Sequence, residues 1–183
     1  MIQTDRLVLR APTDADRPAI AAVNGEPEVG RWLGGVLDRA ASDAMVDRIL
    51  ASIAEHGFGV WVAERRTDAV VVGLIGLQQI TERSGLPMAR GVEIDWRLAP
   101  AAWGCGYATE GAAAALDWGL TNLDEPEILA FTARINPRSQ AVMRRIGMTP
   151  DPVRDFGHPR LAPGDPLHPH VVYRKAGPGT NGH

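Results

Sequence analysis

Two glycines stand one residue apart in the segment WGCGYATEG, residues 103–111, which separates an apolar strand-like run from an alanine-rich run. Gly104 and Gly106 carry no Cβ, so the turn can adopt positive φ angles and present successive N–H groups. A helix that begins after the turn adds unpaired N–H groups and a partial positive charge. This arrangement can hold an anion such as a pyrophosphate, with Thr109 as a hydroxyl donor, although two such glycines also make an ordinary tight turn.

Two familiar phosphate-binding loops do not fit the segment. No Lys-Ser or Lys-Thr pair follows the glycines, which excludes a P-loop. Thr109 occupies the third glycine position of the dinucleotide fingerprint, and APAA separates the strand from the loop. The sequence therefore disfavours a nicotinamide-dependent oxidoreductase and requires a different phosphate site.

Acidic side chains alternate with apolar ones in GVEIDWRL, residues 91–98. A strand with this pattern places Glu93, Asp95 and Arg97 on one face. A carboxylate there can take a proton from an amine through a water molecule, and a second carboxylate nearby raises its pKa. Glu93 is the first candidate for a general base and Asp95 the second; alternatively, Glu93 forms a structural ion pair with Arg97 or with a base on a neighbouring strand.

Other reactive residue types give weaker signals. Cys105 has no evident partner base and is interpreted as a loop residue rather than a nucleophile. His158, His168 and His170 lie near one another in sequence, but no carboxylate spacing completes a metal site, so we predict no metal. Trp32, in a glycine-rich connection, is the tryptophan that we expect to line a substrate pocket.

Hydrophobic periodicity and turn residues predict the elements that position these side chains. We expect a short helix after a Thr13 or Asp14 cap, a second helix capped by Ser42 and ending near Gly57, and a long loop over 155–169. Two further helices are predicted over 106–120 and 137–147, and strands over 6–10, 59–64, 70–80, 91–98, 127–135 and 170–175. The strands 59–64 and 70–80 should pair antiparallel, whereas strand, helix and strand over 91–135 form a parallel crossover.

Composition sets outer bounds on the class of protein. The 183 residues suit one domain, over 1–175, followed by a flexible tail over 176–183. A net charge of −3 argues against broad nucleic-acid or anionic-membrane binding. The lone cysteine excludes an intrachain disulfide, and no signal peptide or spanning segment is seen, so we expect a cytoplasmic protein.

Several segments together resemble the GNAT superfamily of N-acetyltransferases, and within it the branch similar to the ribosomal-protein acetyltransferases RimJ and RimL. The resemblance rests on TDRLVLRAPTDAD, GLIGL, VEIDWRLAPAAWGCGYATEGAAAALDWGL, INPRSQAVMRRIGM and HVVYR, which follow one another in the family's order. The family's loop signature is Q/R-x-x-G-x-G/A. This sequence has Ala101 at its first position, which removes a polar anchor, and Cys105 where a basic residue is frequent.

The resemblance implies a single-domain α/β fold. Its mixed, mostly antiparallel sheet would be flanked by helices, and its central parallel strands, 91–98 and 127–135, would splay apart around acetyl-coenzyme A (acetyl-CoA). The pantetheine arm would pair with the backbone near Arg97 and Leu98, where a backbone N–H would also serve as the oxyanion donor. The remaining implied cofactor-binding residues of the loop are Trp103, Gly104, Cys105, Gly106, Tyr107, Ala108 and Thr109.

The resemblance also implies roles for two residues after the strand 127–135. Asn136 would reach the cofactor. Ser139 would contact the cofactor too and would protonate the departing thiolate, although a serine at this place can equally be a first-turn helix residue that satisfies backbone donors.

The implied activity is transfer of the acetyl group of acetyl-CoA to a primary amine by direct attack in a ternary complex. The acceptor is a protein N-terminus or a small amine, and neither its identity nor a preference for longer acyl groups follows from the sequence. The rival interpretation is a catalytically silent acyl-CoA-binding sensor or regulatory module, which would not need Glu93 or Ser139. Exposed strand edges would permit a homodimer.

Overall fold

The computed structural model describes residues 1–88 and 90–177, so most of the expected tail, residues 178–183, lies outside the described residues. Within them, nine strands form one sheet in the order β1-β2-β3-β4-β5-β6-β9-β7, and β8 pairs with β9. The strands are β1 Ile2–Gln3, β2 Leu7–Arg10, β3 Val60–Arg65, β4 Val71–Ile80, β5 Gly91–Leu98, β6 Glu127–Ala133, β7 Thr149–Pro150, β8 Phe156–Gly157 and β9 Pro169–Ala176.

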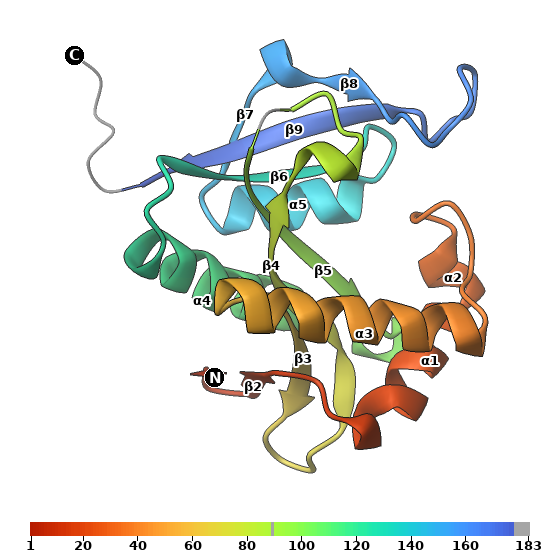
Figure 1. Cartoon of the computed structure of the whole chain (residues 1–183), viewed down its shortest axis with the longest axis vertical. Coiled ribbons are helices and arrows are strands. Elements are labelled where there is room, and N and C mark those ends of the chain that lie inside the picture. The colour runs from red at the N-terminus through yellow and green to blue at the C-terminus, as the bar shows by residue number, and fades with distance from the viewer. Residues whose placement is uncertain (89, 178–183) are drawn as a thin grey trace.

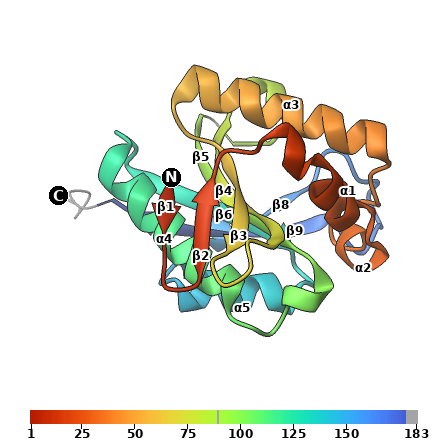
Figure 2. The ribbon, with the colours of Figure 1, turned by 90° about the horizontal axis from the view of Figure 1, so that it is seen from below.

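Helices cover both faces of the sheet (Figures 1 and 2). The α-helices are α1 Arg17–Gly25, α2 Pro27–Gly30, α3 Arg39–His56, α4 Tyr107–Asn122 and α5 Pro137–Arg145. Helices α1 and α3 pack on one face and α4 and α5 on the other. In the part of the chain described, no helix is long and apolar enough to cross a membrane.

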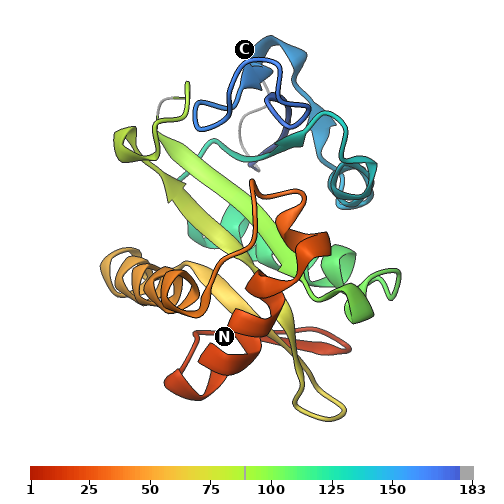
Figure 3. The ribbon, with the colours of Figure 1, turned by 90° about the vertical axis from the view of Figure 1, so that its right-hand side faces the viewer.

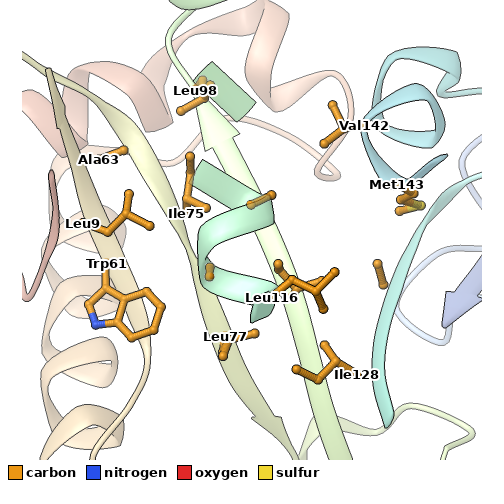
Figure 4. Packing of buried hydrophobic residues seen from close by; sticks show 14 of the residues in the cluster. Leu9, Trp61, Ala63, Ile75, Leu77, Leu98, Leu116, Ile128, Val142 and Met143 are labelled. Atoms are coloured by element: carbon orange, nitrogen blue, oxygen red, sulfur yellow. The ribbon is translucent and has the colours of Figure 1, made fainter. Parts of the chain in front are cut away.

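The alternation of side chains along the strands builds a separate hydrophobic core on each face. On one face, Ile20 of α1 and Val46 of α3 pack against Val62 and Leu74. On the other, Leu116 of α4 packs against the larger cluster of the central strands, to which α5 adds Val142 and Met143 (Figure 4). Burial of these apolar side chains holds α4 against β4, β5 and β6, so the start of α4 is fixed relative to the ends of the strands.

Strands β5 and β6 are the parallel pair of an otherwise antiparallel sheet, and they separate along their length. They pair only at Val92–Ile128 and Glu93–Leu129. Beyond these pairs β5 continues to Leu98 and β6 to Ala133, and Figure 1 shows the two ribbons diverging. The predicted mixed sheet with splayed central strands is confirmed, and so is the crossover through α4.

Turn residues predicted the end of α3 correctly but not its start. Ser42 does not cap the second long helix: α3 begins at Arg39, because Asp38 accepts a hydrogen bond from Ala41 N–H at 2.8 Å. Ser42 is buried inside α3, and its Oγ accepts from Asn24 Nδ2 at 2.9 Å. The predicted helix end near Gly57 is confirmed by its left-handed φ of 76°.

Candidate functional site

A cleft of about 1230 Å³ opens where β5 and β6 diverge. Its walls come from both strands, from the starts of α4 and α5, from the loop after α2 and from the loop between β8 and β9. In Figure 3 the loop after α2 extends toward the blue loop that precedes β9. All the residues that the sequence nominated as catalytic or cofactor-binding line this cleft except Cys105, which is exposed beside it.

The glycine loop has the geometry of an anion site. Gly104 and Gly106 have φ angles of 75° and 83°, which L-residues rarely adopt. Gly106 is the N-cap of α4 and no side chain caps the helix, so the first N–H groups of α4 have no intrahelical partner. A Cβ added at Gly104 would meet no described atom within 4 Å, which leaves the backbone accessible from the cleft.

Arg6, the residue before β2, holds this loop in place. Its Nη1 donates to the carbonyl oxygen of Cys105 at 2.8 Å and its Nε to Glu110 at 2.6 Å. The guanidinium carbon lies 4.8 Å from the centre of the Tyr107 ring. Arg6 also lines the cleft, so it brings a positive charge to the loop in which Cys105 replaces the frequent basic residue.

The free edge of β5 presents backbone groups to the cleft. Ala99 donates its N–H to Val72 O at 2.9 Å, and the β4–β5 register runs without interruption from there. Because paired and unpaired positions alternate in an antiparallel ladder, the N–H and C=O of Trp96 and Leu98 point away from β4 and toward the gap. Those of Arg97 point toward β4. Within the cleft, Leu98 O accepts from Trp103 Nε1 at 2.8 Å.

Glu93 and Asp95 lie side by side on one wall of the cleft. Glu93 is buried, and its Oε2 accepts from Gln78 Nε2 at 3.2 Å. Asp95 Oδ1 is buried without a hydrogen-bond partner in the described structure. Arg97 donates instead to Asn24 Oδ1 at 2.5 Å, and no ion pair joins it to Glu93 in residues 1–88 and 90–177. The alternative of a structural Glu93–Arg97 pair is therefore not seen.

Burial raises the pKa of both carboxyl groups. For Glu93 burial acts first and the Asp95 charge second, and together they raise its pKa well above the usual range. Burial raises the pKa of Asp95 to about 6, and the nearby Arg97 charge partly offsets this. Because the two groups interact, their titration belongs to the pair.

Asn136 and Ser139 stand at the start of α5, on the opposite wall. Asn136 caps the helix: its Oδ1 accepts from Ser139 N–H at 3.2 Å, and its Nδ2 donates to Thr132 Oγ1 at 3.2 Å. One amide hydrogen of Asn136 and the hydroxyl of Ser139 remain without a partner among the described residues. Arg138 of the same turn lies over Trp103, with its guanidinium carbon 4.8 Å from the ring centre.

Aromatic rings and imidazoles line the end of the cleft near the β8–β9 loop. Trp32 and Phe131 contribute to its walls. The rings of His158 and His170 lie 4.8 Å apart, and burial lowers the pKa of each. His168 is not part of the lining, and in the described part of the chain no group of three or more His, Cys, Asp or Glu side chains is arranged to hold a metal ion.

Comparison with known proteins places these features in a family context. The model of the acetyltransferase (GNAT) domain matches residues 6–149. The chain is 28% identical over 148 residues to the uncharacterized protein YkkB of Bacillus subtilis, covering 79% of this chain and 83% of that protein. It is 28% identical over 149 residues to the uncharacterized N-acetyltransferase YoaA of B. subtilis, covering 80% and 81%.

Solved structures show the same fold. An acetyltransferase from Agrobacterium tumefaciens is 30% identical, with a TM-score of 0.76 over 95% of this chain and 92% of that one. Spermidine N-acetyltransferase from Vibrio cholerae, in complex with CoA and spermine, is 19% identical, with a TM-score of 0.73 over 94% and 96%. RimL, a ribosomal L7/L12 alpha-N-protein acetyltransferase in complex with CoA, is 16% identical, with a TM-score of 0.75 over 95% and 96%.

Proposed function

Because this chain belongs to the GNAT family of acetyltransferases, whose cofactor is acetyl-CoA, we propose that it acetylates a primary amine by direct attack in a ternary complex. The observation that carries the proposal is the cleft between β5 and β6. An uncapped helix start lies at one part of this cleft, and at another lies a pair of carboxyl groups, of which Glu93 is buried and Asp95 half-buried. The acceptor is a small amine or a protein N-terminus, the latter suggested by the resemblance to RimJ and RimL.

The residues of the cleft fit a coenzyme A molecule. We assign the pyrophosphate to the N–H groups of residues 104–109, with the hydroxyl of Thr109 and the guanidinium of Arg6 as further donors. We assign the pantetheine arm to the backbone of Trp96 and Leu98, because these groups face the gap and those of Arg97 face β4. The free amide hydrogen of Asn136 completes the contacts on the opposite wall.

The bound cofactor supplies an acetyl thioester, and the chain's own side chains manage the protons. The Glu93–Asp95 pair takes a proton from the ammonium group of the acceptor, with Glu93 as the first candidate base. The amine nitrogen then bonds to the acetyl carbon, and a backbone N–H on the free edge of β5 stabilises the oxyanion. As the carbon–sulfur bond breaks, the Ser139 hydroxyl would donate a proton to the sulfur, and the second proton that the acetylated nitrogen loses would restore that hydroxyl.

The test separates binding from chemistry. Acetyl-CoA and CoA should raise the melting temperature whereas NAD should not, since a ligand that binds the folded state stabilises it. Glu93→Gln and Ser139→Ala should leave the affinity for acetyl-CoA unchanged while thiol release with an amine falls roughly 100-fold. Unchanged turnover in either variant would show that its assigned role is wrong. Binding without transfer to any amine or N-terminal peptide would instead identify a silent acyl-CoA-binding module.

A further inference from the structure

The cleft has an acceptor end, which is separate from the glycine loop. We define it by residues on the sheet face of Asp95 and on the two loops above it: Trp32, Leu33, Asp95, Phe131, Leu161 and His170. The strand register places these side chains on one face of the sheet. Glu93 pairs with Leu129, and Ala133 pairs with His170. Because every second residue of a strand faces the same way, Asp95 and Phe131 lie on this face as well.

Negative charge at the acceptor end is confined to one place. Glu93, Asp95 and Glu110 are the carboxyl groups of the cleft lining within the described residues. Glu110 is already bound by the Thr4 hydroxyl at 2.6 Å and by Arg6. Only the Glu93–Asp95 pair is left to meet an ammonium group, and Asp95 Oδ1 lacks a partner of its own.

The other charged side chains of the cleft lining are cationic. Arg97 lies on the same strand as the pair, and Arg138, Arg145 and Arg160 also line the cleft. Arg160 is exposed, and its guanidinium has no ion-pair partner among the residues described. A second ammonium group on the acceptor would find guanidinium groups and no further free carboxylate in the described part of this lining, and like charges repel one another.

The rest of the acceptor end is apolar, and two loops narrow it. Trp32, Leu33, Phe131 and Leu161 supply carbon surface, and the lowered pKa of His170 keeps its ring neutral near neutral pH. The loop after α2 comes close to the β8–β9 loop, since a Cβ added at Gly34 would lie 3.9 Å from Leu161 Cδ2. This narrowing suits a small molecule better than a protein terminus.

We infer that the acceptor is a small primary amine that carries a single positive charge on an aromatic or apolar body. The inference rests on the proposed function and narrows its acceptor. It separates this chain from the spermidine N-acetyltransferase of V. cholerae, to which the likeness is one of fold.

Two matched pairs of amines test the inference in a thiol-release assay with acetyl-CoA. Hexylamine and 1,6-diaminohexane differ in the second ammonium group, and 2-phenylethylamine and ethylamine differ in the ring. We expect kcat/KM to be at least ~10-fold higher for hexylamine than for the diamine, and at least ~10-fold higher for 2-phenylethylamine than for ethylamine. Equal or reversed ratios would overturn the inference, as would faster transfer to a seryl-alanyl peptide N-terminus than to 2-phenylethylamine.

Two variants assign the preference to named side chains. Trp32→Ala should lower kcat/KM for 2-phenylethylamine about 10-fold while changing that for ethylamine less than about 2-fold. Arg160→Glu should shrink the ratio between hexylamine and the diamine, and Arg160→Gln should shrink it less. Unaltered ratios in both Arg160 variants and in Trp32→Ala would contradict the assignment.

The failure of this inference can be told from that of the proposed function. Acetyl-CoA that neither binds nor stabilises the protein would contradict the proposed function. Acetyl-CoA that binds without transfer to any amine or peptide would contradict it too. Acetyl-CoA that binds, together with a preference for the diamine or with transfer to the peptide but to none of these amines, would overturn the acceptor class alone.

Discussion

At the scale of single residues, the carboxyl pair on β5 couples activity to stability. A group whose pKa is raised by folding stabilises the folded state only at low pH, and this contribution is lost as the pH rises through the raised pKa. For Asp95 the window runs from its ordinary value of 3.8 to about 6. Above that window Asp95 is ionised in the folded protein. Its partly buried charge then opposes folding, but only in this ionised form can it accept a proton as a base.

We therefore predict that Asp95→Asn stabilises the protein at about pH 8 and has little effect at about pH 4. Each pKa unit corresponds to ~1.4 kcal/mol. Because Asp95 is partly exposed, we discount the full value and expect the free energy of unfolding to rise by about 2 kcal/mol. Urea unfolding at the two pH values measures it, with the exposed Asp117→Asn as the control. An equal change at both pH values would show that burial of the Asp95 charge is not its cause.

Arg6 offers a second prediction at this scale. Arg6→Gln should weaken the affinity for acetyl-CoA about 10-fold, because a charge-assisted hydrogen bond to the pyrophosphate is lost. Arg6→Lys should weaken it less, and the affinity for acetyl-pantetheine, which has no pyrophosphate, should not change. Calorimetric titration of both ligands decides the matter.

The control for Arg6 is Arg66→Gln, since Arg66 donates to the backbone of the same segment at Thr4 O and lies outside the cleft lining. Equal losses for the two ligands would contradict a role of Arg6 at the pyrophosphate, because acetyl-pantetheine carries none.

The sequence placed the candidate carboxyl groups on the correct strand face, but it did not indicate the partners of the neighbouring charged residues. Alternation along residues 91–98 was enough to place Glu93 and Asp95 on one face. It gave no sign that Arg97 binds Asn24, 73 positions away, or that Arg6 meets Glu110, 104 positions away. Such contacts depend on how the elements pack, which a local pattern does not encode.

At the scale of elements, β3 and β4 approach too closely for any side chain at Gly76. A Cβ there would lie 2.5 Å from both Gly59 O and Val60 Cα, which are backbone atoms that cannot rotate away. Gly76→Ala should therefore lower the free energy of unfolding by about 2–4 kcal/mol. In contrast, a Cβ at Gly91 of β5 would meet nothing within 4 Å, so Gly91→Ala should change stability by less than ~0.5 kcal/mol. Urea unfolding of both variants tests the pair, and similar losses would refute the steric explanation.

The sequence predicted the helices and strands correctly where one hydrophobic period, of a strand or of a helix, runs through the whole segment. The strand over 91–98 has the same bounds as β5, and α5 begins at Pro137 as expected. The predicted loop over 155–169 contains β8, and β1, β7 and α2 were not predicted. These elements span two to four residues, too few to show a period, and they form because a neighbouring strand or helix supplies their partners.

At the scale of the whole molecule, the cleft divides the sheet into two parts, which in the described structure are joined only where β5 pairs with β6 at two residue pairs. We predict that acetyl-CoA slows amide hydrogen exchange on both sides at once, in residues 94–98 and 107–110 and in residues 136–139. NAD should leave exchange unchanged. Protection confined to 107–110 would show that the pantetheine arm does not lie between the strands. That the chain forms a homodimer through exposed strand edges remains a prediction.

The divergence of β5 from β6 also leaves a row of backbone donors and acceptors, those of Trp96 and Leu98 that face away from β4, without a strand partner. Trp103 covers one carbonyl of that row, at Leu98. An unpaired edge of this kind is a template on which a foreign β-strand can add, the first step of aggregation. The protein's solubility during expression should therefore depend on how much coenzyme A the host cell holds, since the cofactor acts as the missing strand.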